Sequence, residues 1–176
     1  LGSCHVERPI HPLRLDGFPG DPVVENLFPL RDGMSWTFED KLAPDTPPLK
    51  LTVRSVGINS YVLEGGRAAD RIEIAWNGEF LELSREGQLI DRILKYPGRA
   101  GETWVVNQAI FTIFGYDTVE ILGERRRALV VAADRRQMRE IGWFVPDMGW
   151  VRIRTERRGR ALHDTYLVAY EPGRMN

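Results

Sequence analysis

The amino-acid sequence predicts an all-β protein made of two tandem antiparallel β-meanders. Short segments of alternating apolar and polar residues recur along the chain, and a period of two is the pattern of a strand with one buried face. Glycine, proline and Asn-Gly turn signals separate these segments. No stretch combines a helical repeat with helix caps over the length that a helix needs, so we expect little helix.

An aromatic-proline turn occurs twice, 68 residues apart, and divides the chain into two units. The first copy runs from Phe28 to Phe38 and the second from Tyr96 to Val106. Both read aromatic, Pro, any residue, Arg, any residue, Gly, any residue, Ser or Thr, and Trp. Proline fixes φ and glycine permits a positive φ, so these residues form a turn before a strand. We therefore predict two homologous units, 28–95 and 96–176, packed as a sandwich or half-barrel in one compact domain.

The tryptophans are expected to fill a shared core between the two units or to border a site for an apolar ligand. A sheet with one apolar face is stable in water only when that face packs against another. The residues in question are Trp36, Trp76, Trp104, Trp143 and Trp150.

Each expected strand of the first unit is bounded by a turn signal. Met34, Trp36 and Phe38 alternate with polar residues in the first strand. Asn77-Gly78 is the strongest hairpin signal of the chain, because both residue types tolerate the positive φ of a tight turn. The expected strands are 34–40, 49–56, 61–64, 71–76, 80–84 and 89–96.

The second unit repeats this pattern with two departures. We expect 109–114 to be an apolar insert, and Arg125–Arg127 to mark a turn. The segment Pro146–Gly149 replaces the tight Asn-Gly turn. The expected strands are 102–108, 118–123, 128–132, 138–145, 150–155 and 162–170.

Composition and charge narrow the class of protein. The chain has 176 residues, of which 43% are hydrophobic, which is enough for a substantial core. No apolar run reaches the roughly 20 residues that span a bilayer. A net charge of −1 gives no general attraction to nucleic acid, which we do not expect as a partner. The charge is −4 over residues 1–95 and +3 over 96–176, so a homo-oligomer held by opposite charges is left open.

The first four residues, Leu1-Gly2-Ser3-Cys4, resemble the end of a bacterial lipoprotein signal. The resemblance implies that Cys4 receives lipid and that acyl chains hold the protein on a membrane, on its extracytoplasmic side. A Gly-Ser start with an ordinary cysteine is the alternative. Because Cys4 is the single cysteine, neither an intrachain disulfide nor a thiolate metal cluster is expected.

Residues 1–27 are expected to form a tether. Prolines at 9, 12, 19 and 22 disfavour a long helix and favour extended chain. Such a segment serves either as a spacer from the membrane or as an arm that docks on a partner or along a sheet edge.

Two patches resemble a class of exported bacterial lipoproteins that begin with Phe/Tyr-Pro-Leu-x-x-Gly-x-x-Trp and later carry an aromatic hairpin. These patches are Phe28–Phe38 and Trp143–Arg152. The resemblance implies an antiparallel β fold and a cell-envelope location. It brings no active site with it, because members of the class mostly have no assigned function.

The sequence contains no motif for catalysis or for a cofactor. We find no nucleophile elbow, phosphate-binding glycine loop, dinucleotide fingerprint or calcium loop, so we expect neither an enzyme nor a metal or cofactor. His163 and Asp164 are adjacent on an expected strand, so they point to opposite faces and cannot pair with each other. A hydrolase that uses two carboxylates remains the enzymatic alternative.

Arginines cluster around two hairpins of the second unit. If these hairpins are neighbours, their face is basic and suits an anionic partner, such as lipid head groups, anionic glycans or an acidic protein surface. The candidate patch consists of Arg125, Arg126, Arg127, Arg135, Arg136, Arg152, Arg154, Arg157 and Arg158.

Together these features predict a lipid-anchored cell-envelope β protein that acts as a binding or assembly module, as an accessory subunit of a surface complex. The alternative is a carrier that holds a lipid or pigment inside a β half-barrel.

Overall fold

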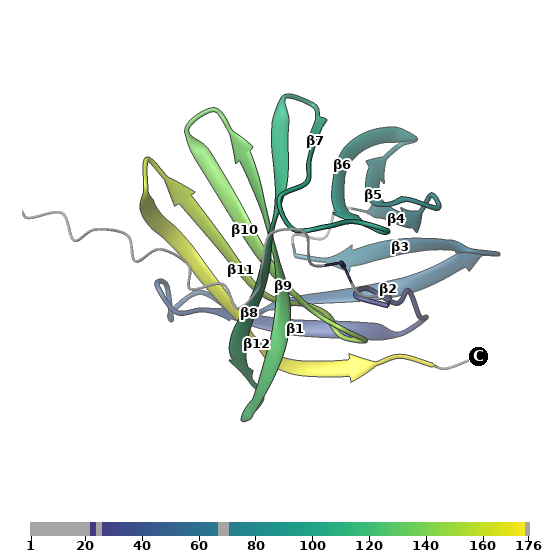
Figure 1. Ribbon diagram of the computed structural model, residues 1–176. Helices are drawn as coiled ribbons and strands as arrows, with labels where there is room; N and C mark the ends of the chain where they lie inside the picture. The colour runs from purple at the N-terminus through teal and green to yellow at the C-terminus, as the bar shows by residue number, and fades with distance from the viewer. Residues whose placement is uncertain (1–21, 24–25, 67–70, 175–176) are drawn as a thin grey trace, which may run out of the picture.

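The computed structural model describes residues 22–23, 26–66 and 71–174, and these residues contain twelve β-strands and no helix (Figure 1). Cys4 and the arm before Pro22 lie outside the described residues. No described segment is a helix that could cross a membrane. The strands are β1 (Met34–Asp40), β2 (Leu49–Gly57), β3 (Ser60–Gly65), β4 (Ile72–Trp76), β5 (Phe80–Arg85), β6 (Gln88–Lys95), β7 (Thr103–Val106), β8 (Ala109–Ile121), β9 (Glu124–Arg135), β10 (Met138–Val145), β11 (Gly149–Arg157) and β12 (Arg160–Pro172).

All twelve strands belong to one antiparallel sheet. Its order is β6-β5-β4-β3-β2-β1-β12-β11-β10-β9-β8-β7, so two six-stranded meanders join where β1 pairs with β12. Trp36 lies opposite Tyr170 in this central pair. The sheet rolls up until β6 and β7, its two edges, approach each other (Figure 1). The predicted all-β, half-barrel fold is confirmed.

Bulges help the sheet to roll. The register shifts between Thr37 and Phe38, between Trp143 and Phe144, and between Ile113 and Gly115. An extra residue in one strand bends that strand and increases its local twist. Further shifts occur between Thr155 and Glu156, between Ser55 and Gly57 and at two places in the β5–β6 pair, so both meanders are bent.

An aromatic cluster around Phe28 fills the centre of the rolled sheet. The Phe28 ring is fully buried, and its centroid lies 4.9 Å from Trp150, 5.2 Å from Trp36 and 6.5 Å from Phe144. Gly149 allows this packing, because a Cβ there would lie 2.8 Å from Phe28 Cδ2 and its φ is +74°. Phe28 therefore links β1 of the first meander to β10 and β11 of the second.

The segment before Phe28 docks on the sheet. Val23 N donates to Gly98 O at 2.9 Å, and Tyr116 Oη donates to Pro22 O at 3.1 Å. Asp147 N donates to Asn26 O at 2.8 Å. In its described part, the arm thus follows the docking alternative rather than the free spacer.

Side chains, not a strand ladder, close the seam between β6 and β7. Trp104 Nε1 donates to Arg92 O at 2.7 Å, and Asn107 Nδ2 donates to Leu89 O and to Ile90 O, both at 2.8 Å. Arg135 Nη2 adds an ion pair to Asp91 Oδ1 at 2.6 Å. These donors occupy carbonyls of an edge strand that would otherwise be open to pairing with another chain.

Two local expectations were wrong. The apolar insert 109–114 and the expected strand 118–123 belong to one strand, β8, because the bulge at Phe114 lets the strand continue through Gly115. Arg125–Arg127 lie within β9, and Leu122-Gly123 makes the turn, with φ values of +52° and +81°.

The structure does not show the two meanders to be copies of each other. Trp36 is fully buried on the central strand β1, whereas Trp104 is half-buried on the edge strand β7 and stacks on Phe111 at 5.5 Å. Trp36 contacts the rings of Phe28, Trp150 and Tyr170 instead. The two tryptophans occupy equivalent positions in the repeated motif but have different neighbours. The reason is that β1 has a strand on each side, whereas β7 has only one.

We predict that Phe28→Ala lowers the free energy of unfolding by about 3–5 kcal/mol, because it leaves a cavity at the junction of the meanders. Urea denaturation followed by tryptophan fluorescence measures the change. Phe80→Ala is the matched control, since Phe80 is only half-buried near the seam, and its loss is expected to be smaller. Equal losses would contradict a central role for Phe28.

Candidate functional site

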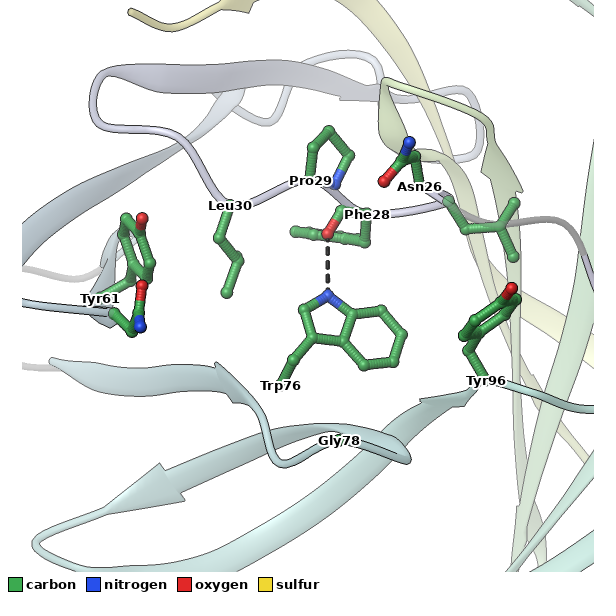
Figure 2. A pocket seen from close by; sticks show the side chains of 10 residues that line it. Asn26, Phe28, Pro29, Leu30, Tyr61, Trp76, Gly78 and Tyr96 are labelled. Carbon is green, nitrogen blue, oxygen red and sulfur yellow. Dashed lines mark hydrogen bonds between the residues drawn. The ribbon is translucent and has the colours of Figure 1, made fainter. Parts of the chain in front are cut away.

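A cleft of about 500 Å³ opens beside Phe28, between the entering segment and the turns of the first meander (Figure 2). Its wall combines the segment 26–30 with residues at the ends of β2, β4 and β6. Alternate turns of a meander lie at opposite ends of its strands, so these turns converge at one end of the sheet. The lining residues are Asn26, Leu27, Phe28, Pro29, Leu30, Asn59, Tyr61, Trp76, Gly78 and Tyr96.

Trp76 is fixed on the floor of the cleft. Its Nε1 donates to Phe28 O at 3.1 Å, which uses its only hydrogen-bonding group. Figure 2 shows Leu30 and Tyr61 on one side of this indole and Tyr96 on the other. Tyr96 N donates to Glu79 O at 2.7 Å, which ties the third ring to the β4–β5 turn. The cleft therefore presents aromatic rings, two phenol groups and carboxamides on a preformed frame.

Both copies of the aromatic-proline turn meet at this cleft. Phe28, Pro29 and Leu30 come from the first copy, and Tyr96 comes from the second. The sequence interpretation used the motif to predict architecture and did not identify it as a site. The sequence does show an aromatic residue at the same position in each copy of the turn. Only the fold, however, brings these two aromatic residues to the same place.

The five tryptophans serve different purposes. Trp36 and Trp150 contact Phe28 in the aromatic cluster, Trp76 lines the cleft and Trp104 closes the seam. Trp143 is buried on the opposite face of the sheet, where its Nε1 donates to Asp117 Oδ2 at 2.9 Å. The residues expected to surround one apolar site are thus distributed over the molecule.

The interior of the rolled sheet is largely filled. A cavity of about 70 Å³ remains among side chains that include Asp91, Phe111, Glu140 and Phe144. This volume holds a few water molecules. It is too small for a lipid or a sugar ring.

Glu140 lines this recess, where protein atoms surround its carboxyl, yet a large part of the residue is exposed to solvent. Burial raises the pKa of its carboxyl above the ordinary value; Arg135 opposes this effect and Asp91 adds to it. Two carboxylates therefore share the recess, but Asp91 is paired with Arg135 at 2.6 Å. The paired acid and the small volume give no support to the carboxylate-hydrolase alternative.

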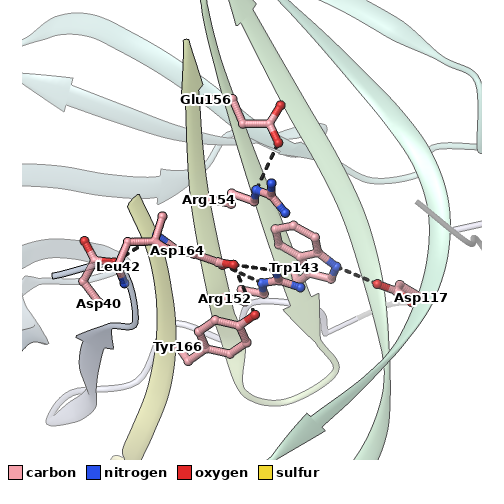
Figure 3. Close-up of polar contacts among 9 residues, drawn as sticks. All are labelled: Asp40, Leu42, Asp117, Trp143, Arg152, Arg154, Glu156, Asp164 and Tyr166. Carbon is pink, nitrogen blue, oxygen red and sulfur yellow. Dashed lines mark hydrogen bonds and ion pairs between the residues drawn. The ribbon is translucent and has the colours of Figure 1, made fainter. Parts of the chain in front are cut away.

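A polar cluster covers Trp143 on the other face of the sheet (Figure 3). Arg152 Nε and Nη2 donate to the two oxygens of Asp164, both at 2.8 Å. The guanidinium carbon lies 4.3 Å from the ring centroid of Trp143 and 4.6 Å from that of Tyr166. Burial lowers the pKa of Arg152, but the hydrogen bonds and charge of Asp164 outweigh it and raise that pKa. The positive charge of Arg152 is therefore balanced by Asp164, and its guanidinium group is held in place.

His163 and Asp164 point to opposite faces, as the sequence predicts. Asp164 binds Arg152, whereas His163 Nδ1 lies 2.7 Å from Asp40 Oδ2. Burial raises the pKa of Asp40, but the N–H groups of Asp164 and Leu42 and the contact with His163 together lower it below the ordinary value. Leu42 N and Asp164 N donate to Asp40 Oδ1 at 2.9 and 3.1 Å. The arrangement is a structural network at the end of β1.

The predicted arginine patch divides into three groups. Arg125–Arg127 lie at one end of β9 and Arg135 at the other, roughly 30 Å away at the rise of a strand. Arg126 is paired with Glu124, and Arg127 lies 4.0 Å above the Tyr116 ring.

The second group is Arg152 with Arg154. Arg154 Nε lies 3.0 Å from Glu156 Oε1 in an ion pair, and this buried nitrogen makes no hydrogen bond with the described residues. The third group is Arg135 and Arg136 with Arg157 and Arg158, at the far ends of β9 and β11. Arg136, Arg157 and Arg158 of this third group are exposed, as Arg125–Arg127 are, and the third group borders a recess.

Among the described residues, no group of three or more His, Cys, Asp or Glu side chains has the geometry to hold a metal ion.

Comparison with protein-family models and with curated proteins gave no match. Among solved structures, a candidate exported protein with a YmcC-like fold from Bacteroides fragilis is 13% identical, with a TM-score of 0.47. A candidate lipoprotein from Parabacteroides distasonis is also 13% identical, with a TM-score of 0.42. Each alignment covers 82% of this chain and 98% of the other. At this level of similarity, the two neighbours assign neither a function nor a location to the chain.

We predict that Glu140→Gln raises the free energy of unfolding at pH 8. The native state holds the Glu140 proton more tightly than the unfolded chain does, so its contribution to stability is full below the ordinary pKa of 4.5 and is lost as pH rises through the raised native pKa. The stability gained by replacing the carboxyl of Glu140 with the amide of Gln should therefore decrease toward pH 4. Urea denaturation across this range measures the difference, with Glu73→Gln, an exposed glutamate outside the recess, as the control. A gain that is independent of pH would contradict the assignment.

Proposed function

We propose that this protein is a non-enzymatic binding module of the cell envelope, held on a membrane by acyl chains on Cys4, and that its cleft binds an extended segment of a partner protein. The observation that carries the proposal is the preformed aromatic cleft beside Phe28. Its volume of about 500 Å³ and its mixture of rings with a few polar groups are typical of binding sites. Tyrosine and tryptophan are also the residue types that dominate binding energy at protein interfaces.

The chain's own entering segment supports a polypeptide as the occupant. At this end of the sheet the segment presents carbonyls that are bound by Trp76 Nε1 and by Asp147 N, and it buries Leu27 and Phe28. A bent stretch of polypeptide, with its carbonyls hydrogen-bonded and its apolar side chains buried, is therefore already accommodated along one wall of the cleft. An extended segment of a partner would find the ring faces of Tyr61, Trp76 and Tyr96 beside it.

The packing of the interior argues against the carrier alternative. A lipid or pigment held between the two halves needs a hollow sheet, but Phe28, Trp36, Phe144 and Trp150 occupy the centre and leave a cavity of about 70 Å³. Binding at the end of the sheet fits this geometry better than storage inside it.

Selection from a random peptide library tests the cleft. We expect selected peptides to share an apolar anchor residue and to bind Leu30→Ala and Tyr96→Ala at least about tenfold more weakly than the parent, because both side chains line the cleft. Leu42→Ala is the matched control, since Leu42 is an exposed leucine outside the cleft. Isothermal titration with one synthetic peptide measures the affinities. The proposal would be refuted if Leu42→Ala weakened peptide binding as strongly as the cleft variants do, or if no peptide were enriched from the library.

Metabolic labelling with an alkyne-tagged fatty acid tests the anchor. When the full precursor is expressed in a bacterial host, we expect label on the protein and its recovery in the membrane fraction. Cys4→Ser should abolish the label and release the protein, because the thiol is the proposed attachment point. An unlabelled parent protein in the soluble fraction would rule out the anchor and would leave the test of the cleft unaffected.

A further inference from the structure

A basic recess lies at the end of the sheet opposite the cleft. The turns that join β7 to β8, β9 to β10 and β11 to β12 lie together at one end of the second meander (Figure 1). They enclose a recess of about 620 Å³. Three arginines, Arg135, Arg136 and Arg157, and three carboxamides, Asn107, Gln108 and Gln137, line it with a single methionine.

The strand register explains why the arginines gather here. Arg135 lies opposite Met138, Met138 lies opposite Arg157, and Arg157 lies opposite Arg160. Directly opposed residues in antiparallel strands place their side chains on the same face. Neighbouring strands are about 4.8 Å apart, so Arg135, Arg157 and Arg160 fall within one row that crosses four strands. Arg136, the remaining arginine of the recess, follows Arg135 in the β9–β10 turn. Like charges placed directly opposite each other destabilise a sheet, as Arg157 and Arg160 do here.

Among the residues that the structure describes, no carboxylate lines the recess. Arg135 uses one nitrogen on Asp91, which fixes its guanidinium at the seam. Arg158 donates Nε to Gln137 Oε1 at 3.2 Å. Arg136 and Arg157 have no ion-pair partner among residues 22–23, 26–66 and 71–174, and both are exposed. This group differs from Arg152, which is fully engaged by Asp164.

We propose that this recess binds a phosphate group through the guanidinium groups of Arg136 and Arg157, with Arg135 and the carboxamides of Gln108 and Gln137 completing the set of donors. Guanidinium groups present paired N–H donors that match the oxygens of phosphate, and the bonds gain from the opposite charges. The bound oxyanion would also relieve the repulsion within the arginine row. The phosphate belongs either to a soluble phosphorylated compound or to a lipid head group, since both offer the same chemistry to these donors.

Isothermal titration with sodium pyrophosphate and with inorganic phosphate, at constant ionic strength, tests the recess. We expect saturable binding of one anion per chain. The double variant Arg136→Gln/Arg157→Gln should bind at least tenfold more weakly, because each charge-assisted bond contributes about tenfold or more. The control Arg71→Gln/Arg125→Gln removes the same charge from exposed positions outside the recess and should stay within about twofold of the parent.

Co-sedimentation with vesicles distinguishes the two sources. Vesicles of phosphatidylcholine with about one third phosphatidylglycerol provide head-group phosphate in an anionic surface. Saturable binding of pyrophosphate identifies a soluble ligand, and binding to vesicles alone, lost in the Arg136/Arg157 variant, identifies a head group. The proposal is overturned if the parent binds neither probe, or if the control variant loses as much binding as the recess variant. Circular dichroism confirms that both variants remain folded.

Discussion

The rest of the structure depends on the ring of Phe28, which precedes the first strand and packs at the junction of the two meanders. It contacts Trp36 of β1 together with Phe144 and Trp150 of the second meander. The same residue presents its carbonyl to Trp76 Nε1 and so fixes the floor of the cleft. Burial of a large aromatic side chain is among the strongest local contributions to a core. One residue thus joins the halves of the sheet and shapes the surface beside them.

Because side chains fill the centre of the rolled sheet, the candidate sites lie at its two ends. Strands that are joined by short turns place alternate turns at opposite ends, so one end collects the aromatic residues around the cleft and the other collects arginines and carboxamides. The seam between β6 and β7 has no ladder, and donors from Trp104 and Asn107 satisfy the edge carbonyls there. The edge of β6 is therefore protected without strand pairing. The side chains that close the seam leave both ends of the sheet open.

Local patterns in the sequence predicted the strands well, because alternation and turn residues act over a few positions. The strands Met34–Asp40 and Met138–Val145 have the predicted bounds. Long-range features escaped this approach: the continuation of β8 through Phe114 depends on a bulge, and the β1–β12 pair joins residues more than a hundred positions apart. The cleft was missed for the same reason, since Phe28 and Tyr96 become neighbours only through the fold.

The arginines show most clearly why a count of charges does not predict a site. Arg152 and Arg157 lie five positions apart on one strand, yet Arg152 pairs with Asp164, diagonally across from it on β12, whereas Arg157 lies opposite Arg160. The side chains within reach on the neighbouring strand, opposite or diagonal, therefore decide whether the charge of a guanidinium is balanced or left to bind another group. Arg135 combines both situations, because it pairs with Asp91, lowers the pKa of the nearby Glu140 carboxyl and borders the open recess. An anion bound in the recess would draw on the same positive charge that favours ionised Glu140, so this one side chain would couple the two groups electrostatically.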